Sequence, residues 1–124
     1  MSLTRAEISR QINSLTRKKN VCENERKKYK TSLTYATKLV GSLSSSRNDL
    51  NYSNSNMEKY FTINNKTADS GKIISTRDEL NEMIRKLNHT IIPEINNNIN
   101  MLTREIANIE RQISSLRRQY ETAD

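Results

Sequence analysis

Residues 102–120 read LTREIANIERQISSLRRQY, with Ile or Leu at every third or fourth position and Tyr120 closing the series. Apolar residues at this spacing form one narrow stripe along an α-helix. The stripe extends back toward the middle of the chain through Leu80, Ile84, Leu87, Ile91, Ile95 and Ile99. A narrow stripe cannot build a globular core by itself, so it predicts a long helix that packs against another helix.

A second, less regular stripe occupies the first half of the chain. One row is Ile8, Leu15, Cys22, Tyr29, Ala36, Leu43, Leu50 and Met57, and the other is Ile12, Lys19, Arg26, Leu33, Val40, Arg47, Asn54 and Phe61. The spacing passes through Gly41, which favours one helix over about residues 4–62, with two helices separated at Gly41 as the alternative. Thr4 and Glu7 form a capping-box pattern at its start. Cys22 lies on the stripe and is predicted to be a small core residue.

Two features divide the rest of the chain. Residues 64–71, NNKTADSG, are polar and turn-forming, and they predict a loop over about 64–74. Thr76 and Glu79 form a second capping-box pattern, so a second helix is expected over about 76–122. Pro93 lies in a local stutter of the stripe, where four-residue spacings follow one another around Ile91 to Ile99. This predicts a kink near residues 89–92, with a break at Thr90 into a third helix as the alternative.

The two stripes predict a single all-α domain over residues 1–124. We expect an elongated, coiled-coil-like, antiparallel two-helix hairpin whose second helix is kinked near Pro93. The composition agrees, because 33% hydrophobic residues, two Gly and one Pro are too few for a sheet or a compact α/β domain. A turn centred near Ala68 would leave Ile8 and Ile12 without an opposite residue, and therefore exposed. Other side chains expected to face water are Tyr35, Leu39, Tyr52, Tyr60, Met83, Ile92 and Met101.

The net charge of +7 lies entirely in residues 1–40, which hold ten Lys and Arg against three Asp and Glu. The basic patch consists of Arg17, Lys18, Lys19, Arg26, Lys27, Lys28 and Lys30. No nucleic-acid-reading motif accompanies it, so an acidic protein partner is favoured over nucleic acid. Lys19, Arg26 and Arg47 interrupt the first stripe, where they either snorkel out of the seam or set register and partner choice. The candidate partner-binding residues are Ile8, Ile12, Leu15, Lys19, Arg26 and Arg47.

The sequence predicts no catalytic, cofactor or metal site. His89 and Cys22 are single, and no metal-ligand spacing or Gly-rich phosphate motif occurs. No apolar run approaches the roughly 18 residues that span a bilayer. The first residues lack the apolar core of a signal peptide, so we expect a cytoplasmic protein, with export without a cleavable signal left open. These absences favour a non-enzymatic interaction protein whose partner is a helical protein or a second copy, with no small-molecule substrate.

The Ile/Leu-rich segment 106–116, the central Asn/Ser/Thr stretch and the missing signal peptide carry a family resemblance. The layout resembles the small helical proteins encoded beside LXG toxins of Gram-positive type VII secretion systems, which are WXG-like hairpins that include the YwqH-like proteins. This chain departs from the pattern, since Leu39-Val40-Gly41 has the glycine of Trp-x-Gly without the tryptophan.

The resemblance implies an adaptor or targeting factor. Such a protein binds the helical N-terminal domain of its cognate toxin, together with a second small helical protein, by helix-in-groove packing. A self-associating coiled-coil structural protein, of phage or cytoskeletal type, is the alternative. A basic helical protein that binds nucleic acid is a third, less favoured one.

Overall fold

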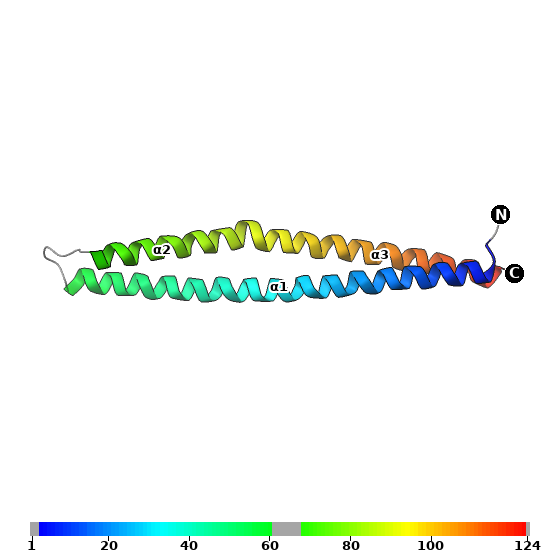
Figure 1. Cartoon of the computed structure of the whole chain (residues 1–124), viewed down its shortest axis with the longest axis horizontal. Helices are drawn as coiled ribbons and strands as arrows, with labels where there is room; N and C mark the ends of the chain where they lie inside the picture. The colour runs from blue at the N-terminus through cyan, green and yellow to red at the C-terminus, as the bar shows by residue number, and fades with distance from the viewer. Residues whose placement is uncertain (1–2, 61–67, 124) are drawn as a thin grey trace. The chain divides into compact units, whose positions relative to one another are not determined.

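The computed structural model describes residues 3–60 and 68–123, which are almost entirely helical and include no strand (Figure 1). The helices are α1 (Arg5–Tyr60), α2 (Ala68–Lys86) and α3 (Ile92–Thr122), and a π-helical turn, η1 (Leu87–Ile91), joins the last two. The chain is therefore all-α. The predicted antiparallel hairpin is confirmed, with α1 as its first helix and α2, η1 and α3 as its second.

The hairpin consists of two compact units, which are described separately. The terminal unit comprises Met1–Ser32 and Ile95–Asp124, so the first part of α1 packs against α3. The central unit comprises Leu33–Glu94, so the rest of α1 packs against α2 and η1. Within each unit the two helical segments run in opposite directions, as Figure 1 shows.

The start of α1 is the capping box that the sequence predicted. The Glu7 amide donates to Thr4 Oγ1 over 3.2 Å, and the Thr4 amide donates to Glu7 Oε2 over 3.4 Å. These two bonds satisfy backbone donors that the first turn leaves without helical partners. Gly41 lies inside α1, so the prediction of one continuous helix through that residue is confirmed.

The start of α2 corrects the sequence prediction. α2 begins at Ala68 instead of near residue 76, so the loop predicted over 64–74 is wrong for residues 68–74. Residues 64–67 lie outside the described residues. Asp and Ser are favoured in the first turn of a helix, and Gly71 would meet nothing within 4 Å if it carried a Cβ. The turn-like composition of this stretch is thus compatible with an exposed helix start, and Thr76 lies inside α2 instead of capping it.

The early start of α2 changes the pairing of the two helices. Arg47 Nη1 donates to Asn81 Oδ1 over 3.3 Å in the central unit, and Arg26 Nη1 donates to Thr103 Oγ1 over 3.4 Å in the terminal unit. In each pair the two residues lie at about equal distances along the sequence from the midpoint between Tyr60 and Ala68. They do not lie at equal distances from Ala68 itself. Within the described residues, the first stripe therefore lies opposite an earlier part of the second helix than predicted.

The irregularity expected near Pro93 is the π-helical turn. The Ile92 amide donates to the Leu87 carbonyl, the i to i+5 bond that defines such a turn. A π turn takes up one more residue than an α turn, and the stripe contains one extra residue here. Pro93 has no amide hydrogen to donate to the carbonyl of His89, so it is tolerated next to this turn. The helix is not broken at Thr90.

The two units have different cores. In the terminal unit the buried side chains are Ile8, Cys22, Ile106, Ile109, Ile113 and Leu116. Ile12, Leu15 and Leu102 pack against the cluster formed by Cys22 and the three central isoleucines. In the central unit the buried side chains are Ala36, Ile84 and Leu87. The prediction that Cys22 is a core residue is confirmed.

Candidate partner-binding surface

The apolar residues predicted to meet a partner belong instead to the core of the terminal unit. Ile8 is only 1% exposed, and Ile12 and Leu15 are half-buried. The prediction that Ile8 and Ile12 are exposed is therefore wrong, because the shifted pairing places α3 opposite them. Arg5, one turn before Ile8, donates to the Tyr120 carbonyl over 3.2 Å and lies 5.1 Å from the centre of that tyrosine ring.

The three basic residues of the first stripe bind the opposite helix of their own unit. Lys19 Nζ lies 3.3 Å from Glu110 Oε1 and 3.8 Å from Glu23 Oε1. Arg26 and Arg47 donate to Thr103 and Asn81, as described above. All three are half-buried, with their charged ends outside the seam. These contacts favour a role in setting the register of the hairpin.

The basic patch does not form one surface. Arg17, Lys18, Lys27 and Lys28 are exposed and make no salt bridge within the described residues, whereas Lys19 and Arg26 lie in the seam. Lys30 is also exposed. The charge is nevertheless concentrated: the terminal unit holds thirteen Lys and Arg against seven Asp and Glu, a net charge of +6, and the central unit holds eight against seven.

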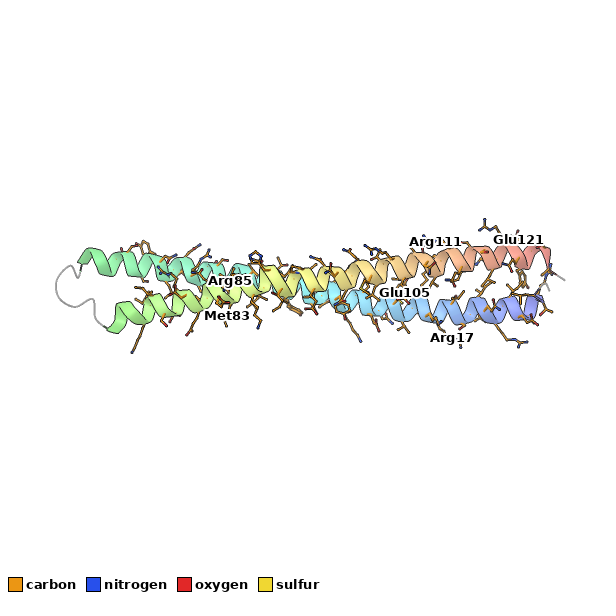
Figure 2. The ribbon with its side chains drawn as sticks, turned by 90° about the horizontal axis from the view of Figure 1, so that it is seen from above. Arg17, Met83, Arg85, Glu105, Arg111 and Glu121 are labelled. Carbon is orange, nitrogen blue, oxygen red and sulfur yellow. The ribbon has the colours of Figure 1, made fainter. Side chains whose placement is uncertain are left out.

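A groove runs along one side of the terminal unit, and we call it the Ser14 groove. Its first hollow, of about 430 Å³, is lined by Gln11, Ser14 and Leu15 of α1 and by Gln112, Ser115, Leu116 and Gln119 of α3. A second hollow, of about 650 Å³, shares Ser14 and adds Arg17, Lys18, Val21, Cys22 and Glu25 of α1 and Glu105 of α3. Arg17 and Glu105 can be located on their helices in Figure 2.

The opposite side of the terminal unit is more polar and carries charge. Its hollow, of about 340 Å³, is lined by Thr16, Lys19, Asn20, Glu110, Ile113, Ser114 and Arg117. The Lys19–Glu110 salt bridge spans the two helices on this side. The two sides thus differ, since the first hollow of the Ser14 groove is lined only by uncharged residues.

Cys22 forms part of the floor of the Ser14 groove. Burial raises the pKa of its thiol, and the Glu105 and Glu25 carboxylates add to the shift. A thiol held in its protonated form is a weak nucleophile and a poor metal ligand. Among the described residues no group of three or more His, Cys, Asp and Glu side chains could hold a metal ion.

Several large apolar side chains outside the seam are exposed, as predicted. These are Tyr35, Leu39, Tyr52, Met83 and Met101, of which Tyr52 is the most exposed at 71%. Met83 is labelled in Figure 2. Ile92 is half-buried, so that prediction is wrong, and the Tyr60 side chain lies outside the described residues. Val21, which the sequence did not single out, is 57% exposed in the Ser14 groove.

Comparison of the chain with protein-family models, curated proteins and solved structures finds no match. Within residues 3–60 and 68–123, no helix is long and apolar enough to cross a membrane.

Proposed function

We propose that this protein is a non-enzymatic adaptor that binds helical segments of another protein. The Ser14 groove is the observation that carries the proposal, because it adjoins the buried cluster of Cys22 and the three isoleucines of α3, and its first hollow is lined by uncharged residues. Interfaces between proteins are depleted of charge at their centre. A helix laid into such a groove would convert two helices into a three-helix bundle.

The partner that best fits the family resemblance is the helical N-terminal domain of an LXG toxin. Support comes from the Ile/Leu-rich segment 106–116, which forms the apolar side of α3. In this proposal the protein meets the toxin in the cytoplasm and accompanies it to a type VII secretion system. A second small helical protein would complete the bundle.

Co-purification tests this proposal directly. The full chain and the N-terminal domain of an LXG toxin from the same organism are expressed together and separated by size, with light scattering to give the mass. We expect a stable complex containing both chains. Two separate peaks, each at the mass of one protein alone, would contradict the toxin partner.

Self-association is the second candidate function. The central unit has a net charge of only +1 and exposes Tyr35, Leu39 and Tyr52, so two copies would meet there with little repulsion. Light scattering of the chain alone distinguishes the candidates. A mass above that of one chain at micromolar concentration favours self-association, and Tyr35→Ser should then lower it.

A further inference from the structure

We infer that the Ser14 groove binds a net-acidic amphipathic helix of another protein, with the apolar ridge of that helix lying over Leu15 and Leu116. This inference deepens the proposed function, on which it rests for the idea of a helical partner. It adds the face that is used, the charge of the partner and the length of the segment that fits.

The lining of the first hollow of the groove is suited to burial. Gln11, Ser14, Gln112, Ser115 and Gln119 are uncharged, although the terminal unit as a whole contains twenty charged residues. Covering a charged side chain without a partner is costly, whereas amide and hydroxyl groups can exchange water for hydrogen bonds with the incoming helix. Leu15 and Leu116 supply the apolar floor.

Charge decides which helix can occupy the groove. A second copy of the chain would bring one terminal unit of +6 against another, and like charges oppose association. A net-acidic helix is attracted by the same field. Arg17 and Lys18 line the second hollow and make no salt bridge within the described residues, so they are available to acidic side chains of the partner.

The two carboxylates of the second hollow refine the pattern. Glu25 of α1 and Glu105 of α3 both line this hollow and are exposed. We therefore expect acidic residues of the bound helix beside Arg17 and Lys18 and none beside Glu25 or Glu105. The groove follows α1 from Gln11 to Glu25, about 21 Å at 1.5 Å per residue, which is the length of a four-turn helix.

A pair of adjacent serines provides matched variants. Ser115 lines the Ser14 groove, and Ser114 lines the hollow on the opposite side. Ser115→Glu and Ser114→Glu make the same change of charge at neighbouring positions of one helix, on different sides of the hairpin; Ser115 is half-buried and Ser114 is exposed. A carboxylate at residue 115 would be buried under an acidic helix, which should weaken binding about tenfold or more, whereas Ser114→Glu should cost less than about threefold.

The probe is a synthetic amphipathic helix of four turns with a Leu ridge and Glu flanks, labelled for fluorescence anisotropy. The full chain should bind it, should not bind the same peptide with Lys in place of Glu, and should lose binding through Ser115→Glu but not through Ser114→Glu. Circular dichroism verifies that both variants are folded. Gln112→Glu, at an exposed groove position, is the second variant if Ser115→Glu lowers helicity.

Equal effects of the two serine variants, preference for the Lys peptide, or no binding of either peptide would overturn the inference. So would a dimer of the chain alone that Ser115→Glu dissociates. The toxin domain separates this inference from the proposed function. If it binds the wild-type chain and Ser115→Glu equally well, the inference fails and the proposed function stands. If the toxin domain does not bind, while the acidic peptide binds and Ser115→Glu abolishes that binding, the proposed toxin partner is wrong and the inference about the groove stands.

Discussion

The terminal and central units share one architecture, a segment of α1 packed antiparallel to a returning helix, but their seams differ. Among the described residues, the terminal unit buries six apolar side chains, four of them isoleucines, and the central unit buries Ala36, Ile84 and Leu87. The first carries a net charge of +6 and the second +1. The comparison indicates a division of roles: the terminal unit has the larger described apolar core and presents a groove, and the central unit buries fewer apolar side chains among its described residues.

Removing residues 1–13 should have the largest effect on the free energy of unfolding, because these residues belong to the core of the terminal unit. The deletion removes the capping box, the buried Ile8 and the half-buried Ile12. The free energy of unfolding should therefore fall by about 4 kcal/mol, since burial contributes about 1.5–3 kcal/mol for a fully buried isoleucine and the cap about 1 kcal/mol. Urea denaturation followed by circular dichroism measures it. An unchanged midpoint would show that the two isoleucines do not contribute to the core.

Ile109→Ala and Ile84→Ala compare the two cores directly. Ile109 lies in the cluster with Cys22, Ile106 and Ile113, and its truncation should cost about 3 kcal/mol. Ile84 is also buried but lies outside that cluster, so its truncation should cost about half as much. Equal losses in the same urea titration would mean that the two seams are packed equally well.

Arg47→Leu should stabilise the protein, in contrast to the preceding variants. Arg47 is half-buried in the seam of the central unit, where its contact with Asn81 contributes little because it is largely exposed to water. Leu at this position extends the apolar stripe, and the unfolding free energy should rise by about 1 kcal/mol. Lys38→Leu, at an exposed position of the same helix, is the control and should change it much less. A loss of stability through Arg47→Leu would assign the arginine a larger part in fixing the register.

The pH dependence of the terminal unit should show the smallest effect. Burial raises the pKa of Cys22, so the folded state keeps the thiol proton at a pH at which the unfolded chain has lost it. Stability is therefore complete below the unfolded pKa and falls as the pH rises toward the folded pKa. Cys22→Ala should remove this part of the slope in urea titrations at successive pH values. An identical slope in both proteins would contradict a buried thiol.

The fold could be predicted from the sequence because both apolar stripes are regular, and a stripe on a helix needs a helical partner. The register could not, since residues 68–74 have the composition of a loop and are the start of α2. The residue at which α2 begins determines which residues of the two helices lie opposite each other. It therefore also determines whether Ile8 and Ile12 are exposed. The irregular spacing of the stripe near Pro93 signalled a distortion of the second helix. The sequence did not predict that this distortion is a π-helical turn.

The candidate surface was predicted less well. Lys19, Arg26 and Arg47 were identified as unusual, but each contacts a residue of the opposite helix of the same hairpin. The Ser14 groove was missed because Gln and Ser carry no strong signal in a polar chain. A signal does exist: Gln112, Ser115 and Gln119 flank the stripe at helical spacing, whereas Glu110, Arg111, Arg117 and Arg118 in the same segment are charged.

Hydrogen–deuterium exchange of the full chain, with and without the acidic peptide, tests the central claim most directly. In the free protein we expect the slowest exchange between Leu102 and Leu116 and faster exchange in the central unit. The peptide should add protection on both helices of the Ser14 groove, near Ser14 and near Ser115. Slowest exchange in the central unit, or protection that appears there on adding the peptide, would contradict the division of roles between the two units.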